Sequence, residues 1–171
     1  MTYHGRVRIL VDGNNVMGAL AAECVDAGRS MLCGLLERFA ERVEGRVTVV
    51  FDGPPRRGES AQQAEPSRVT VLYGADRTAD DVVIDHLRAD SAPRRLTVVS
   101  SDRQIRREAR KRRCRIVRAE PFARWLLAPA PEPSQPDEPP AKLHGLADED
   151  DAARWLEQFD LSDGGDIEPG G

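Results

Sequence analysis

Cysteine, aromatic residues and long apolar runs are all scarce in this sequence. Only three of its 171 residues are cysteine, an odd number without a CxxC spacing. This usage argues against a disulfide framework or a zinc site and favours reduced thiols in a cytoplasmic protein. Aromatic residues make up 5%, so base stacking should contribute little to any nucleic-acid binding. No apolar run approaches membrane-spanning length and the amino terminus lacks a signal-type apolar core, so we expect no membrane association.

Motifs of nucleotide-cofactor enzymes are also missing. No Walker-type phosphate loop occurs, and residues 13–18, which follow the first predicted strand, do not match the dinucleotide-binding fingerprint. The three histidines, His4, His86 and His144, have no spacing that suits a catalytic triad or a metal site. The sequence therefore argues against nucleotide-cofactor chemistry and against histidine-based catalysis.

Charge is distributed unevenly, although the net charge is only −4. From residue 129 onward the chain has 12 acidic and 2 basic residues, a net charge of −10. Residues 1–128 therefore carry 23 basic and 17 acidic residues, a net charge of +6. A basic body suits a polyanionic partner. The acidic extension either shields that body or simply keeps the protein in solution.

Apolar, β-prone runs alternate with helical patterns over residues 1–127. Strands are predicted at 7–11, 47–51, 69–73, 96–100 and 115–117, and helices at 31–43, from Thr78 to Leu87, at 103–113 and at 122–127. Ser30 is the expected N-cap of the first helix, Gly45 follows its end, and the residues after the first strand are expected to form a turn. Strands that alternate with helices predict a three-layer α/β/α sandwich with a central, mainly parallel sheet.

The remainder of the chain divides into three short segments. Residues 128–147 form a proline-rich acidic linker, residues 148–161 an amphipathic helix and residues 162–171 a disordered tail. A helix this short is marginal alone, so it must dock on the body or on a protein partner. The oligomeric state stays open.

Acidic residues recur where the predicted strands end. Asp12, Asp52 and Asp102 follow three different strands, and Asp80 opens the helix after another. Neighbouring strands lie about 4.8 Å apart. Carboxylates at that spacing repel by roughly 4 kcal/mol per pair at an effective dielectric constant near 20, which favours a bound cation.

These acids also have purely structural interpretations. An ordinary turn explains Asp12 and the two residues after it. Thr78 and Asp81 fit a capping box, and both Asp80 and Asp81 can simply complement a helix dipole. Against these readings, oxygen ligands select Mg²⁺ or Mn²⁺, and such an ion can activate water for phosphodiester hydrolysis.

Arginine residues dominate the predicted helix after Asp102. Four of them share one helical face that begins at the acidic residues: Arg103, Arg106, Arg107 and Arg110. That face suits a phosphate backbone that leads to the metal site. The alternative is a solvated helix face, since Glu108 interrupts the basic run. The polar loop 54–68 either clamps the same backbone or is an idle connection.

Four sequence pieces together resemble the YacP-like branch of the NYN domain family of PIN-like ribonucleases. The pieces are Val-Asp-Gly-Asn-Asn-Val (11–16), Val-Phe-Asp-Gly (50–53), Arg-Thr-Ala-Asp-Asp-Val-Val-Ile (77–84) and Val-Ser-Ser-Asp-Arg-Gln-Ile (99–105). They occur in family order and the resemblance covers residues 7–127. It implies a PIN-like α/β/α fold with a site for one or two Mg²⁺ or Mn²⁺ ions.

The resemblance also assigns roles to individual positions. It places Asp12, Asp80 and Asp102 among the catalytic, metal-binding acids, with Asp52 and Asp81 as further metal ligands. Asn15 matches the family's asparagine beside the first acid. Asn14 stands where many relatives have tyrosine, so we expect a different substrate contact there.

Three functional hypotheses follow. The first is a metal-dependent endoribonuclease, with Mg²⁺ or Mn²⁺ as cofactor and single-stranded or flexible RNA as substrate. The second is an RNA-binding module with little or no catalysis. The third is a scaffold that is recruited through the helix at 148–161. A truncation of residues 141–171 distinguishes the first from the third, because only the third loses its activity.

Overall fold

The computed structural model describes residues 7–24, 27–57 and 67–129. Its elements are, in chain order, β1 (Arg8–Asp12), α1 (Gly13–Glu23), α2 (Arg29–Arg42), β2 (Arg46–Phe51), β3 (Val69–Tyr73), α3 (Ala79–Ala89), the 3₁₀ helix η2 (Pro93–Arg95), β4 (Leu96–Val99), α4 (Arg103–Lys111), β5 (Arg115–Val117) and α5 (Ala119–Leu127). Most of the proline-rich linker, the predicted helix at 148–161 and the tail lie outside these residues.

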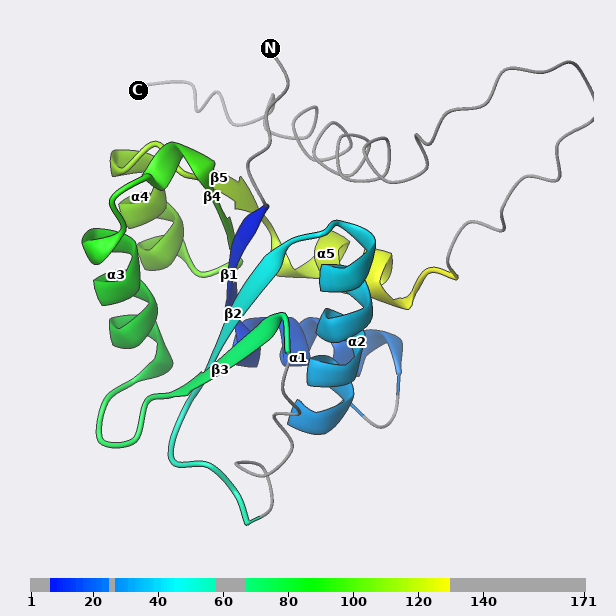
Figure 1. The fold of residues 1–171 in the computed structure, drawn as a ribbon. Helices are drawn as coiled ribbons and strands as arrows, with labels where there is room; N and C mark the ends of the chain where they lie inside the picture. The colour runs from blue at the N-terminus through cyan, green and yellow to red at the C-terminus, as the bar shows by residue number, and fades with distance from the viewer. Residues whose placement is uncertain (1–6, 25–26, 58–66, 130–171) are drawn as a thin grey trace, which may run out of the picture.

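The five strands form one parallel sheet in the order β3-β2-β1-β4-β5 (Figure 1). Because all strands are parallel, their carboxyl ends share one edge, which faces downward in Figure 1. The chain winds outward from β1 in both directions, so β1 and β4 flank the point where the strand order reverses. Ligands of open α/β sheets bind beyond the carboxyl ends of strands at such a point.

Helices cover both faces of the sheet and confirm the predicted three-layer sandwich. On one face, α1, α2 and α5 bury a core that includes Leu20, Leu36 and Phe122. On the other, α3 and α4 bury a smaller core that includes Leu87 and Ile105. The strands between them are apolar on both sides, as expected for a parallel sheet enclosed by helices.

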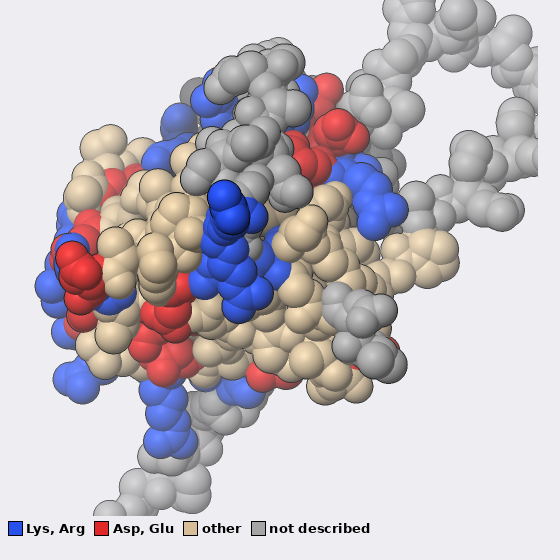
Figure 2. Space-filling model, turned by 90° about the horizontal axis from the view of Figure 1, so that it is seen from below, with Lys and Arg blue, Asp and Glu red and all other residues tan. Residues whose placement is uncertain are grey.

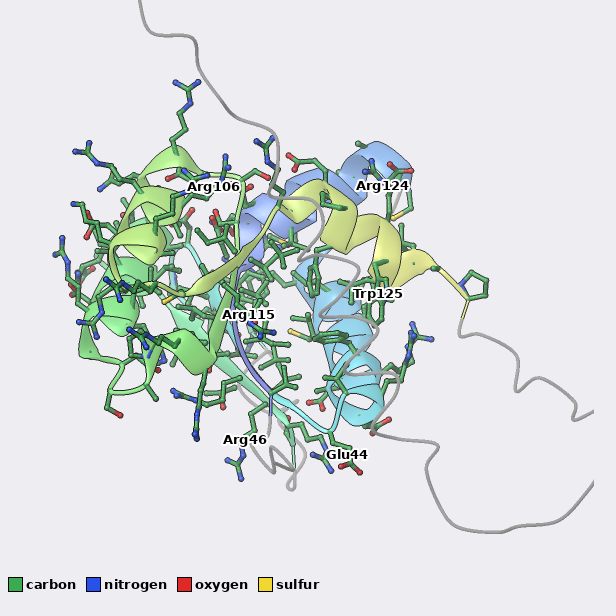
Figure 3. The ribbon with its side chains drawn as sticks, turned by 90° about the horizontal axis from the view of Figure 1, so that it is seen from above. Glu44, Arg46, Arg106, Arg115, Arg124 and Trp125 are labelled. Carbon is green, nitrogen blue, oxygen red and sulfur yellow. The ribbon has the colours of Figure 1, made fainter. Side chains whose placement is uncertain are left out.

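Aromatic contacts join the helices of the larger layer. The Phe39 ring of α2 meets the Phe122 and Trp125 rings of α5 edge-on, with centroids 5.4 Å and 5.0 Å apart. Trp125 lies beside α2 in Figure 3, where the Arg42 guanidinium stands 4.3 Å from its ring centroid. Edge-on packing suits the ring quadrupole and adds to the area that these side chains bury.

The predicted turn after the first strand is wrong, because α1 begins directly at Gly13. Asp12 is the N-cap of this helix and accepts a hydrogen bond from the Asn15 backbone N–H at 3.2 Å. A Cβ at Gly13 would lie 2.6 Å from the Val50 carbonyl oxygen, so glycine permits the close crossing over β2. Two asparagines in the first turn weaken the helical sequence pattern, while burial of Val16 stabilises the helix against the core.

The N-cap of α2 also differs from the prediction. The helix begins at Arg29, with Gly28 as N-cap and no side-chain capping bond, and Ser30 lies inside it. The Arg29 guanidinium donates to the Pro54 carbonyl at 3.2 Å, so a tertiary contact holds the first residue of the helix. Within the described residues, no helix is long and apolar enough to cross a membrane.

Candidate active site

Asp12 lies at the centre of the candidate site, at the carboxyl end of the central strand. Its side chain is almost entirely buried, with 2% of the residue exposed. The Ser100 hydroxyl donates to Asp12 Oδ2 at 2.9 Å, and the Asn15 backbone N–H binds Oδ1. Two hydrogen bonds to the ionised form keep this carboxylate in one orientation despite its burial.

Ser100 links Asp12 to Asp102 across the point where the strand order reverses. Its hydroxyl oxygen accepts a hydrogen bond from the Asp102 backbone N–H at 3.0 Å while its proton goes to Asp12. Asp102 is the N-cap of α4, and its Oδ1 accepts from the backbone N–H groups of Gln104 and Ile105 at 2.8 and 3.0 Å. Because Oδ1 takes both capping bonds, Asp102 Oδ2 remains available for a ligand.

Asn15 closes the same junction from the other side. Its Oδ1 accepts from the Ser101 backbone N–H at 3.1 Å, which ties the start of α1 to the segment after β4. The amide Nδ2 group therefore remains the donor that Asn15 can offer to a ligand. Asn15 is half-buried beside Asp12, and its role in shaping the site stays a prediction.

Asp52 has a structural task that the sequence did not reveal. Its Oδ1 accepts from the Ala79 backbone N–H at 2.6 Å, and its Oδ2 accepts from the Asn14 amide. Asp52 therefore fastens the start of α3 to the end of β2 and to α1. The Asn14 side-chain amide N–H donates to Asp52 and orients it. The Asn14 Oδ1 atom can accept a hydrogen bond from another group.

Asp80 and Asp81 are neighbours with different surroundings. Asp81 is exposed and forms the expected cap: its backbone N–H donates to the Thr78 hydroxyl oxygen at 3.2 Å, and the Thr78 hydroxyl donates to its carboxylate at 2.9 Å. Asp80 is half-buried in the first turn of α3. The cap thus occupies Asp81 and leaves Asp80 to face the other acids.

The electrostatics show that these acids form one group. Burial raises the pKa of the Asp12 carboxyl above its usual value, and the charges of Asp80 and Asp102 raise it further. Burial also raises the pKa of Asp80, with added repulsion from Asp102, Asp52 and Asp81. Figure 2, which looks onto the carboxyl edge from below, shows acidic side chains gathered in a patch with basic side chains beside it. Five carboxylates from four segments therefore repel one another at one end of the sheet.

Among the described residues, no group of three or more histidine, cysteine, aspartate or glutamate side chains is arranged so that it could hold a metal ion. The donors nevertheless fit a hard divalent cation, since they are carboxylate oxygens whose repulsion such a cation would relieve. Mg²⁺ commonly keeps several waters and binds through one or two carboxylates, so it needs no closed cage. Among these acids, Asp12, Asp80 and Asp102 are the ones whose charges act on one another most directly.

The predicted basic face lies on α4, directly after Asp102. Arg103, Arg107 and Arg110 are exposed, and Arg106 is half-buried. Ile105 and Ala109 point into the core, so the arginines occupy the outer side of the helix. The helix therefore carries basic side chains away from the acidic group toward its own carboxyl end.

Three polar residues around the acids had no role assigned from the sequence: Ser100, Ser101 and Glu120. Ser100 was predicted as the last residue of a strand and Ser101 as the residue that follows it, yet each joins two segments of the site. The Ser101 hydroxyl donates to the Glu120 carboxylate at 2.5 Å and accepts from the Ala119 backbone N–H at 3.0 Å. This hydrogen bond from Ser101 lowers the pKa of Glu120. Two serines directly before a strand-end acid are a sequence signal that could have indicated these bonds.

Comparisons with known proteins identify the family of this chain. The family model of the YacP-like NYN domain matches residues 9–133, and the chain belongs to this family, a PIN-like nuclease domain. A search of curated proteins finds no significant match.

Two solved structures share the fold. The crystal structure of Rae1 (YacP) from Bacillus subtilis is 24% identical, with a TM-score of 0.56, over 70% of this chain and 72% of that chain. A tryptophan-to-leucine variant of the same protein is 23% identical, with a TM-score of 0.52, over 69% and 72% of the two chains.

Proposed function

We propose that this protein is a metal-dependent endoribonuclease that hydrolyses phosphodiester bonds of single-stranded or flexible RNA. Membership of a nuclease-type family supports the reaction class. The observation that carries the proposal is the mutual repulsion of Asp12, Asp80 and Asp102 at the reversal point of the sheet. A fold maintains such a repulsive group at a cost in stability, which a function that needs a cation explains.

Asp12, Asp80 and Asp102 would hold one or two Mg²⁺ or Mn²⁺ ions, with Asp52 and Asp81 at the margin. A bound cation there supplies charge stabilisation for the phosphate and activates a water for attack on phosphorus. Asp12 is oriented by Ser100 and Asp102 by its own capping bonds, so neither carboxylate has to be ordered when a ligand arrives. Such preorganisation lowers the cost of reaching the reactive geometry.

The residues around the acids would position the RNA. The Asn15 Nδ2 group is a neutral donor beside Asp12 and suits a phosphate oxygen. Arg103 and Arg107 follow along the outer side of α4 and suit the next phosphates of the strand. Contacts of this kind bind the backbone rather than the bases, so binding should depend strongly on salt and weakly on sequence.

Labelled RNA and DNA oligomers of the same sequence test the proposal. We expect RNA cleavage by the full chain in Mg²⁺ or Mn²⁺, and no cleavage after addition of a chelator. Asp102→Asn should abolish cleavage without unfolding the protein, because asparagine is as good an N-cap as aspartate. A gel of cleavage products and a thermal melt measure the two effects.

Asp85→Asn is the matched control, since it removes one exposed carboxylate of α3 outside the acidic group. It should cleave RNA at the wild-type rate. Cleavage that survives the chelator, or an Asp102→Asn variant as fast as wild type, would contradict the proposal. RNA binding without cleavage in either metal would favour the RNA-binding module instead, and cleavage of DNA alone would correct the substrate.

A further inference from the structure

A second charged feature lies at the amino end of the sheet, away from the acidic group. There a cavity of about 520 Å³ opens between the segment before β4 and the turn after α4. Its lining residues are Ser91, Ala92, Pro93, Arg94, Arg95, Lys111, Arg112 and Arg113. Five of these eight side chains are cationic and none is acidic, so the cavity suits an anion.

The nearby acids neutralise only one of these five cations, Lys111. Asp90 is paired with Arg8, and Glu108 is shared between Lys111 and Arg88. Within the part of the chain that the structure describes, no ion pair involves Arg94, Arg95 or Arg113. Three exposed guanidinium groups therefore remain for an external anion.

Arg112 and Arg113 are held in place by the backbone around them. Arg112 Nη2 donates to the Asp90 carbonyl at 2.5 Å, and its Nε is buried without a hydrogen-bond partner in the described residues. Arg113 has φ 59°, a left-handed conformation that glycine adopts more easily at the end of a helix.

The helix α4 connects the cavity with the candidate active site. It begins at the Asp102 cap and ends at Arg112, so its length is roughly 15 Å at 1.5 Å per residue. Arg103, Arg107 and Lys111 follow each other at intervals of four residues and form one row along it. The last member of this row lines the cavity. Backbone charges of one strand lie about 3.4 Å apart along a stacked helix and farther apart in an extended strand, so at most about four or five nucleotides span α4.

We propose that the basic cavity is a distal anchoring subsite for the phosphate backbone of RNA that already occupies the candidate active site. This inference rests on the proposed function and deepens it, because it names the substrate length that the protein requires. RNA of two nucleotides reaches only the acidic group and the start of α4. RNA of sixteen nucleotides also reaches Arg94, Arg95 and Arg113.

Binding and cleavage of these two RNA lengths by the full chain test the inference. Arg94→Gln combined with Arg95→Gln should weaken binding of the 16-nucleotide RNA by about tenfold at low salt. It should also reduce the slope of log K against log salt by about 1.4, which corresponds to two lost phosphate contacts. Binding and cleavage of the 2-nucleotide RNA should stay at wild-type values, so failure of the active site itself would be recognised separately.

Arg38→Gln combined with Arg124→Gln is the matched control. Both arginines are exposed, on α2 and α5, which cover the opposite face of the sheet. This pair removes the same charge and should leave both RNA lengths unaffected. Thermal melts of all variants confirm that they fold.

Two outcomes would overturn the inference. One is wild-type affinity of the cavity variant for the 16-nucleotide RNA, or an equal loss in the control pair. The other concerns a free phosphate compound as ligand, with inorganic triphosphate as the probe. Triphosphate binding that the cavity substitutions abolish, together with unchanged RNA binding, would assign the cavity to a small polyphosphate.

Discussion

Aspartate residues at the two ends of the sheet have opposite electrostatic surroundings. At the carboxyl end, Asp12 and Asp80 are surrounded by other carboxylates, which together with burial raise their pKa values. At the amino end, burial alone would raise the pKa of Asp90, but its hydrogen bonds with Arg8 and Ala92 outweigh burial and lower it. At the carboxyl end, the acids therefore repel one another. At the amino end, the buried Asp90 carboxylate is paired with Arg8.

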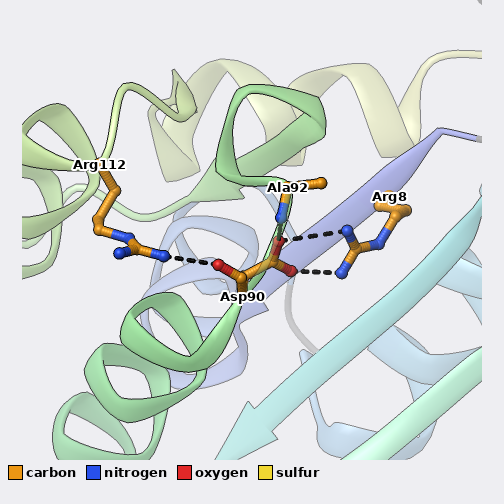
Figure 4. A network of polar contacts seen from close by, with 4 residues as sticks. All are labelled: Arg8, Asp90, Ala92 and Arg112. Atoms are coloured by element: carbon orange, nitrogen blue, oxygen red, sulfur yellow. Dashed lines mark hydrogen bonds and ion pairs between the residues drawn. The ribbon is translucent and has the colours of Figure 1, made fainter.

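Figure 4 shows the polar contacts that surround Asp90. Arg8 binds both carboxylate oxygens, the Ala92 backbone N–H donates to Oδ1 at 2.8 Å, and Arg112 binds the backbone carbonyl of Asp90. These contacts join the first residue of β1 to the ends of α3 and α4. The chain can pair a buried acid with an arginine, so the acids at the other end, which have no such partner among the ion pairs of the described residues, agree with the proposal of a bound cation.

The largest expected effect separates the neighbours Asp80 and Asp81. Asp80→Asn should reduce RNA cleavage by at least about 100-fold, because it removes a carboxylate of the proposed metal site. Asp81→Asn should stay within about fivefold of wild type, because Asp81 serves mainly the Thr78 cap. Single-turnover cleavage rates in saturating Mg²⁺ measure both. Equal losses of cleavage rate in the two variants would contradict the assignment of Asp80 as a metal ligand and Asp81 as a capping residue.

The next largest effect concerns Asp90, the paired acid at the amino end of the sheet. Asp90→Asn should lower the free energy of unfolding at pH 7 by about 2 kcal/mol, below the cost of breaking a fully buried pair since the Arg8 side chain is 41% exposed. Because the folded pKa of Asp90 is lowered, its contribution is present above the unfolded value, about 3.9, and is lost as pH falls through the folded value. Urea titrations at pH 7 and pH 2.5 should show the difference between variant and wild type shrinking at the lower pH. A difference independent of pH would contradict this account.

A smaller effect is expected on the basic face between the two ends. Arg106→Ala with Arg110→Ala should weaken RNA binding by about tenfold and flatten its salt dependence by about 1.4 in slope. Arg110 is exposed, whereas Arg106 is half-buried with its Nε buried, so a thermal melt must confirm that the double variant folds. Fluorescence anisotropy across a salt titration provides the measurement. Unchanged binding would place the RNA elsewhere on the surface.

The smallest effect has the opposite sign to that of Asp90→Asn. Asp80→Asn should raise the free energy of unfolding at pH 7 by up to about 1 kcal/mol without metal, because it relieves repulsion among the acids. Wild type should gain the same stability as pH falls through the raised pKa of Asp80, and the two proteins should converge there. A destabilised Asp80→Asn variant in metal-free buffer would show that this end of the sheet is not under repulsion.

Much of the fold could be predicted because its signals are local. The strand β3 was predicted at its observed residues 69–73, and the other strands to within one residue at either end. Such runs are readable since a strand buried on both faces must be apolar at nearly every position. The helix α1 was missed because its start depends on the Asp12 cap and on the room that Gly13 leaves over β2, not on a strong helical pattern.

The candidate site was foreseeable only in outline. The recurrence of acids at strand ends predicted that they would share one edge, since parallel strands end together. The Ser100–Asp12 hydrogen bond spans 88 residues of sequence, and the role of Asp52 at the start of α3 spans 27. No spacing rule predicts contacts of that range, because they depend on which strands become neighbours.

The sequence by itself determined that the sheet is parallel, that helices enclose it and that its acids gather at one edge, because hydrophobic patterning and chain direction are properties of the sequence. Only the tertiary structure decided that Asp12 is buried at the centre, that Asp81 takes part in a helix cap and that Asp90 pairs with an arginine. It also brought residues 91–95 beside residues 111–113 to form the basic cavity. The physical reason is that charge interactions depend on distances in space, and the strand order 3-2-1-4-5 sets those distances.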